Sequence, residues 1–213
     1  MIGISGSHRT GKTTLAQAFA KRYEIPFVRT SASEVFQAIG RDPTKEYPIE
    51  ERISIQETLL FAFEKQFEEA QKRSRIWISD RTPIDLASYM LADIQRSTFE
   101  NCPKLADMTT SYVRRCIERT NQWFSTLMLL QPGIGLVAEE GKAQCCPAYI
   151  EHLNYVQAGL LQDSDVSAAV YKIPRHYTNL EHRIECVHNA VERSITGYLE
   201  LKEVRQVLGI PTH

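Results

Sequence analysis

The sequence carries no large excess of either charge. Its 213 residues include 25 Lys and Arg against 26 Asp and Glu, for a formal net charge of −1. Proteins that bind nucleic acid without regard to sequence usually carry a strong positive charge. The near-balance therefore argues against a large nucleic-acid footprint, although it leaves room for a local basic groove.

The sequence also lacks paired cysteines and long apolar runs. Its five cysteines are odd in number and show no C-x-x-C spacing: Cys102, Cys116, Cys145, Cys146 and Cys186. This pattern is unlike a disulfide framework or a zinc site and favours a reducing compartment. The adjacent Cys145 and Cys146 are either a redox element or two incidental thiols. With no membrane-spanning run, and an N-terminal segment typical of a core strand rather than a signal sequence, we expect a cytoplasmic protein without membrane contact.

What the sequence does contain, close to its start, is the pattern G-x-x-x-x-G-K-[ST]. It is formed by Gly6, Ser7, His8, Arg9, Thr10, Gly11, Lys12 and Thr13, with Thr14 following. An apolar run precedes the pattern and a helical segment follows it. Glycines at both ends let the backbone approach a ligand, and the loop amides and the start of the helix together attract a phosphate chain. Lys12 would reach the outer phosphates, and the Thr13 hydroxyl would be a ligand of Mg²⁺. We therefore expect ATP and Mg²⁺ as cofactors.

Short apolar runs alternate with amphipathic segments along the whole chain. We expect strands near residues 1–5, 26–29, 75–80, 126–130 and 166–173. We expect helices near residues 12–23, 34–39, 49–73, 82–96, 105–124, 148–161 and 179–208. This alternation predicts an α/β fold with a mainly parallel sheet and helices on both faces. The length fits one domain over residues 1–213, with a small lid over about residues 133–150.

Ligands of such sheets bind at the carboxyl ends of the strands, and this rule selects further candidates. Asp80 ends the strand expected at 75–80 and is followed by Arg81. Asp80 either supports Mg²⁺ or caps the next helix. Arg81 either stabilises the charge of a transferring phosphoryl group or forms a surface salt bridge.

Four other regions carry charged residues with two interpretations each. Glu34 is either a general base for an acceptor hydroxyl or a first-turn acid favoured by the helix dipole, and Asp85 raises the same question. Lys142 is either a lid cation or a solvated loop charge. Arg175 and His176 would flank the nucleotide base by stacking, or are ordinary loop residues.

These residues together resemble a family of small P-loop kinases and ATPases, frequent in phages, that includes the ribosylnicotinamide kinase domain. The resemblance rests on residues 6–16, 33–36, 80–86 and 140–142. It implies a P-loop NTPase fold of nucleoside-kinase type, with five parallel strands in the order 2-3-1-4-5. Asp80 and Arg81 look like the acidic–arginine pair of deoxynucleoside and thymidylate kinases, and Glu34 like the acceptor-site carboxylate of ribosylnicotinamide kinases. Where the family's lid usually carries arginine, this chain has Lys142, which cannot bind phosphate in the same bidentate way.

The expected function is ATP- and Mg²⁺-dependent phosphoryl transfer to a small nucleoside or nucleoside monophosphate. Lys12, Arg81, Glu34 and Asp80 are the expected catalytic residues, and Thr13 and Asp80 the expected metal residues. Two alternatives remain open. One is a kinase that acts on modified DNA, and the other is a P-loop regulatory ATPase with no acceptor pocket.

Overall fold

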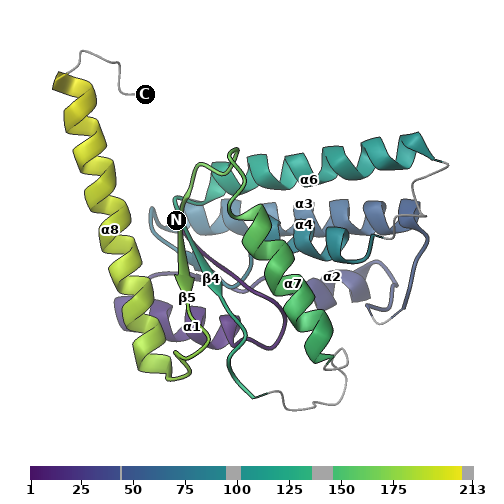
Figure 1. Cartoon of the computed structure of the whole chain (residues 1–213), viewed down its shortest axis with the longest axis horizontal. Helices are drawn as coiled ribbons and strands as arrows, with labels where there is room; N and C mark the ends of the chain where they lie inside the picture. Colours follow the sequence, from purple (N-terminus) through teal and green to yellow (C-terminus); the bar gives the residue numbers. More distant parts are fainter. Residues whose placement is uncertain (44, 95–101, 136–145, 208–213) are drawn as a thin grey trace.

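A five-stranded, fully parallel sheet organises the molecule, with helices on both of its faces (Figure 1). The computed structural model describes residues 1–43, 45–94, 102–135 and 146–207, with side chains up to residue 202. The strands lie in the order β2-β3-β1-β4-β5. The predicted α/β class and strand order are both confirmed.

The strands are short, and the central ones are wholly buried. They are β1 (Ile2–Ser5), β2 (Phe27–Val28), β3 (Ile78–Ser79), β4 (Thr126–Leu130) and β5 (Ala169–Ile173). The third strand is shorter than the predicted 75–80. The Ser74 hydroxyl donates to the Ile76 carbonyl oxygen at 2.8 Å and holds a turn there, which leaves Ile76 54% exposed outside the sheet. The fifth strand also begins later than predicted, at Ala169.

Seven helices of the described chain connect and cover these strands. They are α1 (Lys12–Tyr23), α2 (Ala32–Ala38), α3 (Ile49–Arg73), α4 (Pro83–Ala92), α6 (Pro103–Trp123), α7 (Pro147–Leu160) and α8 (Leu180–Val207). Proline occupies the first position of α4, α6 and α7, where its missing N–H breaks no helical hydrogen bond. Helix α2 begins two residues earlier than predicted because Ser31 is its N-cap and accepts the Glu34 amide at 3.3 Å.

Two apolar cores lie on opposite faces of the sheet. On one face α1 and α8 pack through residues such as Leu15, Phe19 and Val187. On the other, α3, α4 and α6 surround an aromatic cluster in which the Phe67 ring lies 5.3 Å from Trp77 and 5.2 Å from Phe124. Since helices cover both faces of the sheet, the carboxyl ends of its strands are the candidate ligand site.

Among the helices of the described residues, none combines the length and the apolar character that crossing a membrane requires.

Candidate active site at the carboxyl ends of the strands

The segment that follows β1 curves back around the side chain of Lys12. Its ammonium Nζ donates to the carbonyl oxygens of Gly6 at 2.7 Å and Ser7 at 2.8 Å. Gly11 precedes α1 in a left-handed conformation with φ of 88°, and Arg9 has φ of 61°. The loop is therefore closed around one buried cation, as a phosphate-binding loop requires.

Both glycines of the loop are needed for packing as well as for conformation. A β-carbon on Gly6 would lie 2.6 Å from the Leu130 carbonyl oxygen of β4, closer than real contacts allow. One on Gly11 would lie 3.2 Å from Nη1 of Arg183, in addition to the strain of its positive φ. The loop thus fits tightly against the sheet on one side and against α8 on the other.

Several basic side chains lie together at the loop. Burial, and then the charge of Arg81, lowers the pKa of Lys12 to about 8, while Asp85 and Asp80 act in the opposite direction. Burial also lowers the pKa of His8 to about 4, with Lys12, Arg81 and Arg9 adding to the effect. Several cations thus meet at one place, and this arrangement suits an anionic ligand.

Asp80 connects this loop to the next two strands. Its Oδ2 accepts a hydrogen bond from the Thr13 hydroxyl at 2.6 Å. Its Oδ1 accepts from the backbone amide of Thr30 at 2.9 Å and from the Thr30 hydroxyl at 3.0 Å. The carboxylate is 3% exposed, so these contacts hold one oxygen against β2 and direct the other at Thr13.

The pair of Thr13 and Asp80 is chemically suited to magnesium. Mg²⁺ prefers hard oxygen ligands and is usually held by one or two protein oxygens together with water and substrate phosphates. Within the described ranges, no group of three or more His, Cys, Asp or Glu side chains is arranged to hold a metal. The donor set fits a magnesium ion bound together with a nucleotide better than a resident metal centre.

Asp85 is a buried structural carboxylate. It is fully buried, and its Oδ2 accepts from the backbone amide of Thr82 at 2.8 Å and from the Ser5 hydroxyl at 3.0 Å. Its Oδ1 accepts from the Gly6 amide at 3.3 Å and from Nε2 of Gln157 at 3.2 Å. The helix-start interpretation therefore holds, and the residue also ties the beginning of the phosphate loop to α4 and α7.

Arg81 is largely buried beside the loop. Its guanidinium carbon lies 5.8 Å from the centre of the Tyr89 ring, a cation–π distance. Burial alone would lower the pKa of Arg81, but Tyr89 and Asp85 outweigh it, and the pKa lies above its ordinary value. Arg81 is thus a permanently charged group close to Lys12 and Asp80, rather than one arm of a surface salt bridge.

Glu34 lies in the first turn of α2, beyond Thr30, and its side chain is exposed. Its backbone amide is used in the cap of that helix. Thr14 in the first turn of α1 is likewise exposed. The acceptor role of Glu34 and the nucleotide contact of Thr14 stay predictions.

The residues predicted near the nucleotide base are engaged with other parts of the chain. Nη2 of Arg175 donates to Oε2 of Glu151 at 2.6 Å, and its Nη1 also pairs with that carboxylate. The neighbouring His176 ring lies 4.6 Å from that of Tyr177. Lys142, together with most of the expected lid, lies outside the described residues. The roles of Arg175 and Lys142 in nucleotide binding therefore stay predictions.

Two contacts escaped the sequence argument, one made by Arg183 and one by Thr30. Arg183 of α8 is 2% exposed and donates from Nη1 to the Thr10 carbonyl oxygen at 2.9 Å. It is separated from Thr10 by 173 positions and belongs to no motif, so no sequence pattern indicates the contact. Thr30 was expected only as a helix cap, whereas it binds Asp80.

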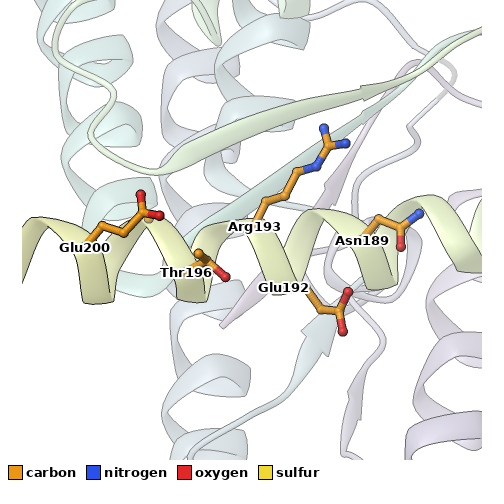
Figure 2. A pocket seen from close by; sticks show the side chains of 6 residues that line it. Asn189, Glu192, Arg193, Thr196 and Glu200 are labelled. Carbon is orange, nitrogen blue, oxygen red and sulfur yellow. The ribbon is translucent and has the colours of Figure 1, made fainter.

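Two surface hollows lie away from the phosphate loop. One, of about 530 Å³, runs beside α8, and its side chains all come from that one helix, among them Asn189, Arg193 and Glu200 (Figure 2). The other, of about 340 Å³, lies between β2 and α3 and is lined in part by Arg29, Lys65 and Arg73. Neither is lined by residues 6–13, so the candidate site is the strand-end rim itself rather than either hollow.

Comparisons with known proteins agree with this architecture. A family model described as AAA domain matches residues 1–124. A structure of deoxyadenosine kinase from M. mycoides with the products dCMP and dCDP superposes with a TM-score of 0.63 at 17% identity, over 90% of this chain and 98% of that one. The structure of the same kinase with bound dATP gives a TM-score of 0.63 at 16% identity, and the structure with bound dCTP gives a TM-score of 0.61 at 14% identity. The coverage of both chains is the same in each case. No curated protein matches the chain.

Proposed function

This chain belongs to the AAA domain family, and from that premise and the geometry of its strand-end rim we propose that it is a P-loop kinase. It would use Mg·ATP to phosphorylate the hydroxyl group of a small nucleoside. The observation that carries the proposal is the hydrogen bond of 2.6 Å between Thr13 and Asp80, which joins the phosphate loop to the acidic–arginine pair.

The donor would bind on the phosphate loop. The loop amides and Lys12 would hold the phosphates, and Thr13, supported by Asp80, would contact the magnesium ion, which neutralises charge on the β- and γ-phosphates when bound. Arg81 would face the transferring group and stabilise the charge that it develops. Most of the rate enhancement would come from positioning and electrostatics, because phosphoryl transfer needs little covalent help from the protein.

The acceptor would bind between Asp80 and α2, where Glu34 could orient or deprotonate its hydroxyl. Two cations on this side are paired with carboxylates: Arg41 pairs with Glu51 at 2.7 Å, and Arg52 pairs with Asp93. A nucleoside monophosphate would need cations available for its phosphate. The pairing supports an uncharged nucleoside as acceptor, and so do the superposing structures of deoxyadenosine kinase, a protein named for phosphorylating a nucleoside.

The test is a panel of acceptors incubated with the protein, Mg²⁺ and γ-labelled ATP. The panel holds nucleosides, deoxynucleosides, nucleoside monophosphates and hydroxymethylated DNA. We expect label in a nucleoside monophosphate product. Label in nucleoside diphosphates would shift the assignment to a nucleotide kinase, and phosphate release that does not depend on any acceptor would support a regulatory ATPase instead.

The panel includes DNA because of one specific feature of the surface. The hollow between β2 and α3 carries Arg29, Lys65 and Arg73, with Glu69 as an opposing charge, and Arg29 directly precedes Thr30 of the rim. A DNA acceptor would make transfer strongly salt-dependent, since bound phosphates release counterions. A nucleoside acceptor would leave transfer nearly independent of salt.

A further inference from the structure

A buried arginine of α8 lies directly behind the phosphate loop. Arg183 donates from Nη1 to the Thr10 carbonyl oxygen at 2.9 Å and from Nε to the Tyr177 carbonyl oxygen at 2.5 Å. One side chain therefore joins the phosphate loop to the loop between β5 and α8. The contact is close, because a β-carbon on Gly11 would lie 3.2 Å from the same Nη1 atom.

The bond to Thr10 determines how the next amide is directed. The described chain has no cis peptide bonds, and in a trans peptide the C=O and the N–H point in opposite directions. Because Arg183 holds the Thr10 carbonyl toward α8, the Gly11 N–H is directed away from α8. A loop amide can bind an anion only when its N–H faces that anion, so the orientation of this peptide matters for any ligand on the loop. Glycine at this position could otherwise turn the peptide over at little cost.

The charge of Arg183 is not offset by these contacts. Both hydrogen-bond acceptors are neutral carbonyl oxygens, Nη2 is buried without a partner among the described residues, and burial lowers the pKa of the guanidinium. A buried cation with neutral partners costs folding free energy. A polyanion bound on the loop would offset that charge, so the arrangement favours the ligand-bound protein.

We propose that Arg183 is a positioning residue for the donor phosphates. It holds the Thr10–Gly11 peptide in the orientation that binds an anion, and it adds positive charge behind the loop. The inference rests on the proposed function only in requiring that the loop bind a nucleoside triphosphate.

The test measures equilibrium binding of Mg·ATP and of inorganic tripolyphosphate by calorimetry, without any phosphoryl transfer. We expect Arg183→Gln to weaken the binding of both ligands by about tenfold to a hundredfold, since hydrogen bonds from a charged group are lost. We expect Arg183→Lys to weaken their binding by about tenfold. The matched control is Arg22→Gln. Arg22 of α1 pairs with Glu181 of α8, so the control loosens the same two helices without touching the loop. We expect the control to bind both ligands within about twofold of wild type.

Three outcomes would overturn the proposal. The first is a folded Arg183→Gln protein that binds both ligands as wild type does. The second is an Arg183→Gln protein that binds ATP more weakly but tripolyphosphate as tightly as wild type does. That result would place Arg183 near the nucleotide base. The third is an Arg22→Gln protein that loses as much affinity for both ligands as Arg183→Gln does. That result would mean that Arg183 acts only through the packing of α1 and α8. If Arg183→Gln does not fold, Arg183→Lys decides by the same criteria.

The experiment also separates this proposal from the proposed function. A wild-type protein that binds ATP but phosphorylates no acceptor would defeat only the kinase assignment. A wild-type protein that binds neither ligand would defeat both.

Discussion

The proposed donor side and the proposed acceptor side of the rim differ in how firmly their side chains are held. On the donor side Lys12 is 6% exposed and Asp80 is 3% exposed, and both are hydrogen bonded within the protein. On the acceptor side Glu34 is exposed, and Arg41 and Arg52 are occupied by carboxylates. The phosphate loop is thus preformed, whereas the acceptor side has its specific groups at the surface.

This difference follows from what each ligand offers. A triphosphate is recognised by backbone amides and a few charges, which a loop closed between β1 and α1 can place before any ligand arrives. A nucleoside is recognised through a few polar atoms and a ring, and under the proposed function an exposed carboxylate such as Glu34 would be positioned only when the acceptor binds. We therefore expect substitutions on the two sides to affect different steps.

The largest effect is expected on the donor side, at Lys12. Lys12→Ala removes the ammonium that holds the Gly6 and Ser7 carbonyls and would contact the outer phosphates. Phosphoryl transfer should fall by about a thousandfold or more, while circular dichroism and the thermal midpoint show a folded protein. Transfer at the wild-type rate by a folded Lys12→Ala protein would remove the loop from the mechanism.

A second donor-side test concerns the oxygen that faces Thr13. Asp80→Asn keeps an oxygen acceptor for Thr30 but removes the negative charge. We expect transfer to fall by about a hundredfold at limiting Mg²⁺ and to recover in part at high Mg²⁺, measured by a magnesium titration of the initial rate. Asp163→Asn, at an exposed aspartate just beyond α7, serves as the control. An unaltered magnesium dependence would show that Asp80 is structural.

The acceptor side is tested at Glu34. Glu34→Gln should lower kcat/KM for the nucleoside by about tenfold to a hundredfold, because a general base or an orienting charge is lost. The Kd for ATP should stay within about twofold, since the side chain of Glu34 is exposed and its backbone amide bonds to Ser31 in the cap of α2. Glu24→Gln, beside the end of α1, controls for loss of one surface carboxylate. A drop in ATP affinity alone would contradict the division of the rim into two sides.

The smallest expected effect is a pH dependence of stability from His8. Its pKa is about 4 in the folded protein, against about 6.5 for an unfolded chain. Between these values the unfolded state binds more protons, so the free energy of unfolding falls as pH falls from about 6.5 to about 4. His8→Asn should flatten this slope in urea titrations. An equal slope in wild type and His8→Asn would show that burial of His8 and its neighbouring cations do not oppose its protonation.

The parts of the site that could be predicted from sequence are those that local backbone geometry determines. The loop at residues 6–13, the start of α1 at Lys12 and the cap of α4 at Thr82 need only neighbours in the chain. The place of Asp80 at the rim followed from a further rule, that parallel strands end at the same edge. These features are confirmed because each depends on a short segment or on a general property of parallel sheets.

The contacts that sequence reasoning missed join segments far apart in the chain. Asp85 and Arg175 show the difference: Asp85 gains the Gly6 amide and Gln157 as partners, and Arg175 gains Glu151. These contacts correspond to no recognisable spacing in the sequence, because each side chain could have formed a hydrogen bond with a different polar group. Charge and burial at these positions depend on which helices pack together.

By itself, the sequence predicted a phosphate-binding loop and a mainly parallel sheet covered by helices, since glycine spacing and the alternation of strands and helices act locally. The strand order followed from the resemblance to small P-loop kinases. Only the tertiary structure decided that Asp85 is buried, that Arg175 pairs with Glu151 and that Arg183 donates to the Thr10 carbonyl oxygen. Those outcomes depend on the packing of α4, α7 and α8, in which the burial of each charge and the reach of its partners are determined together.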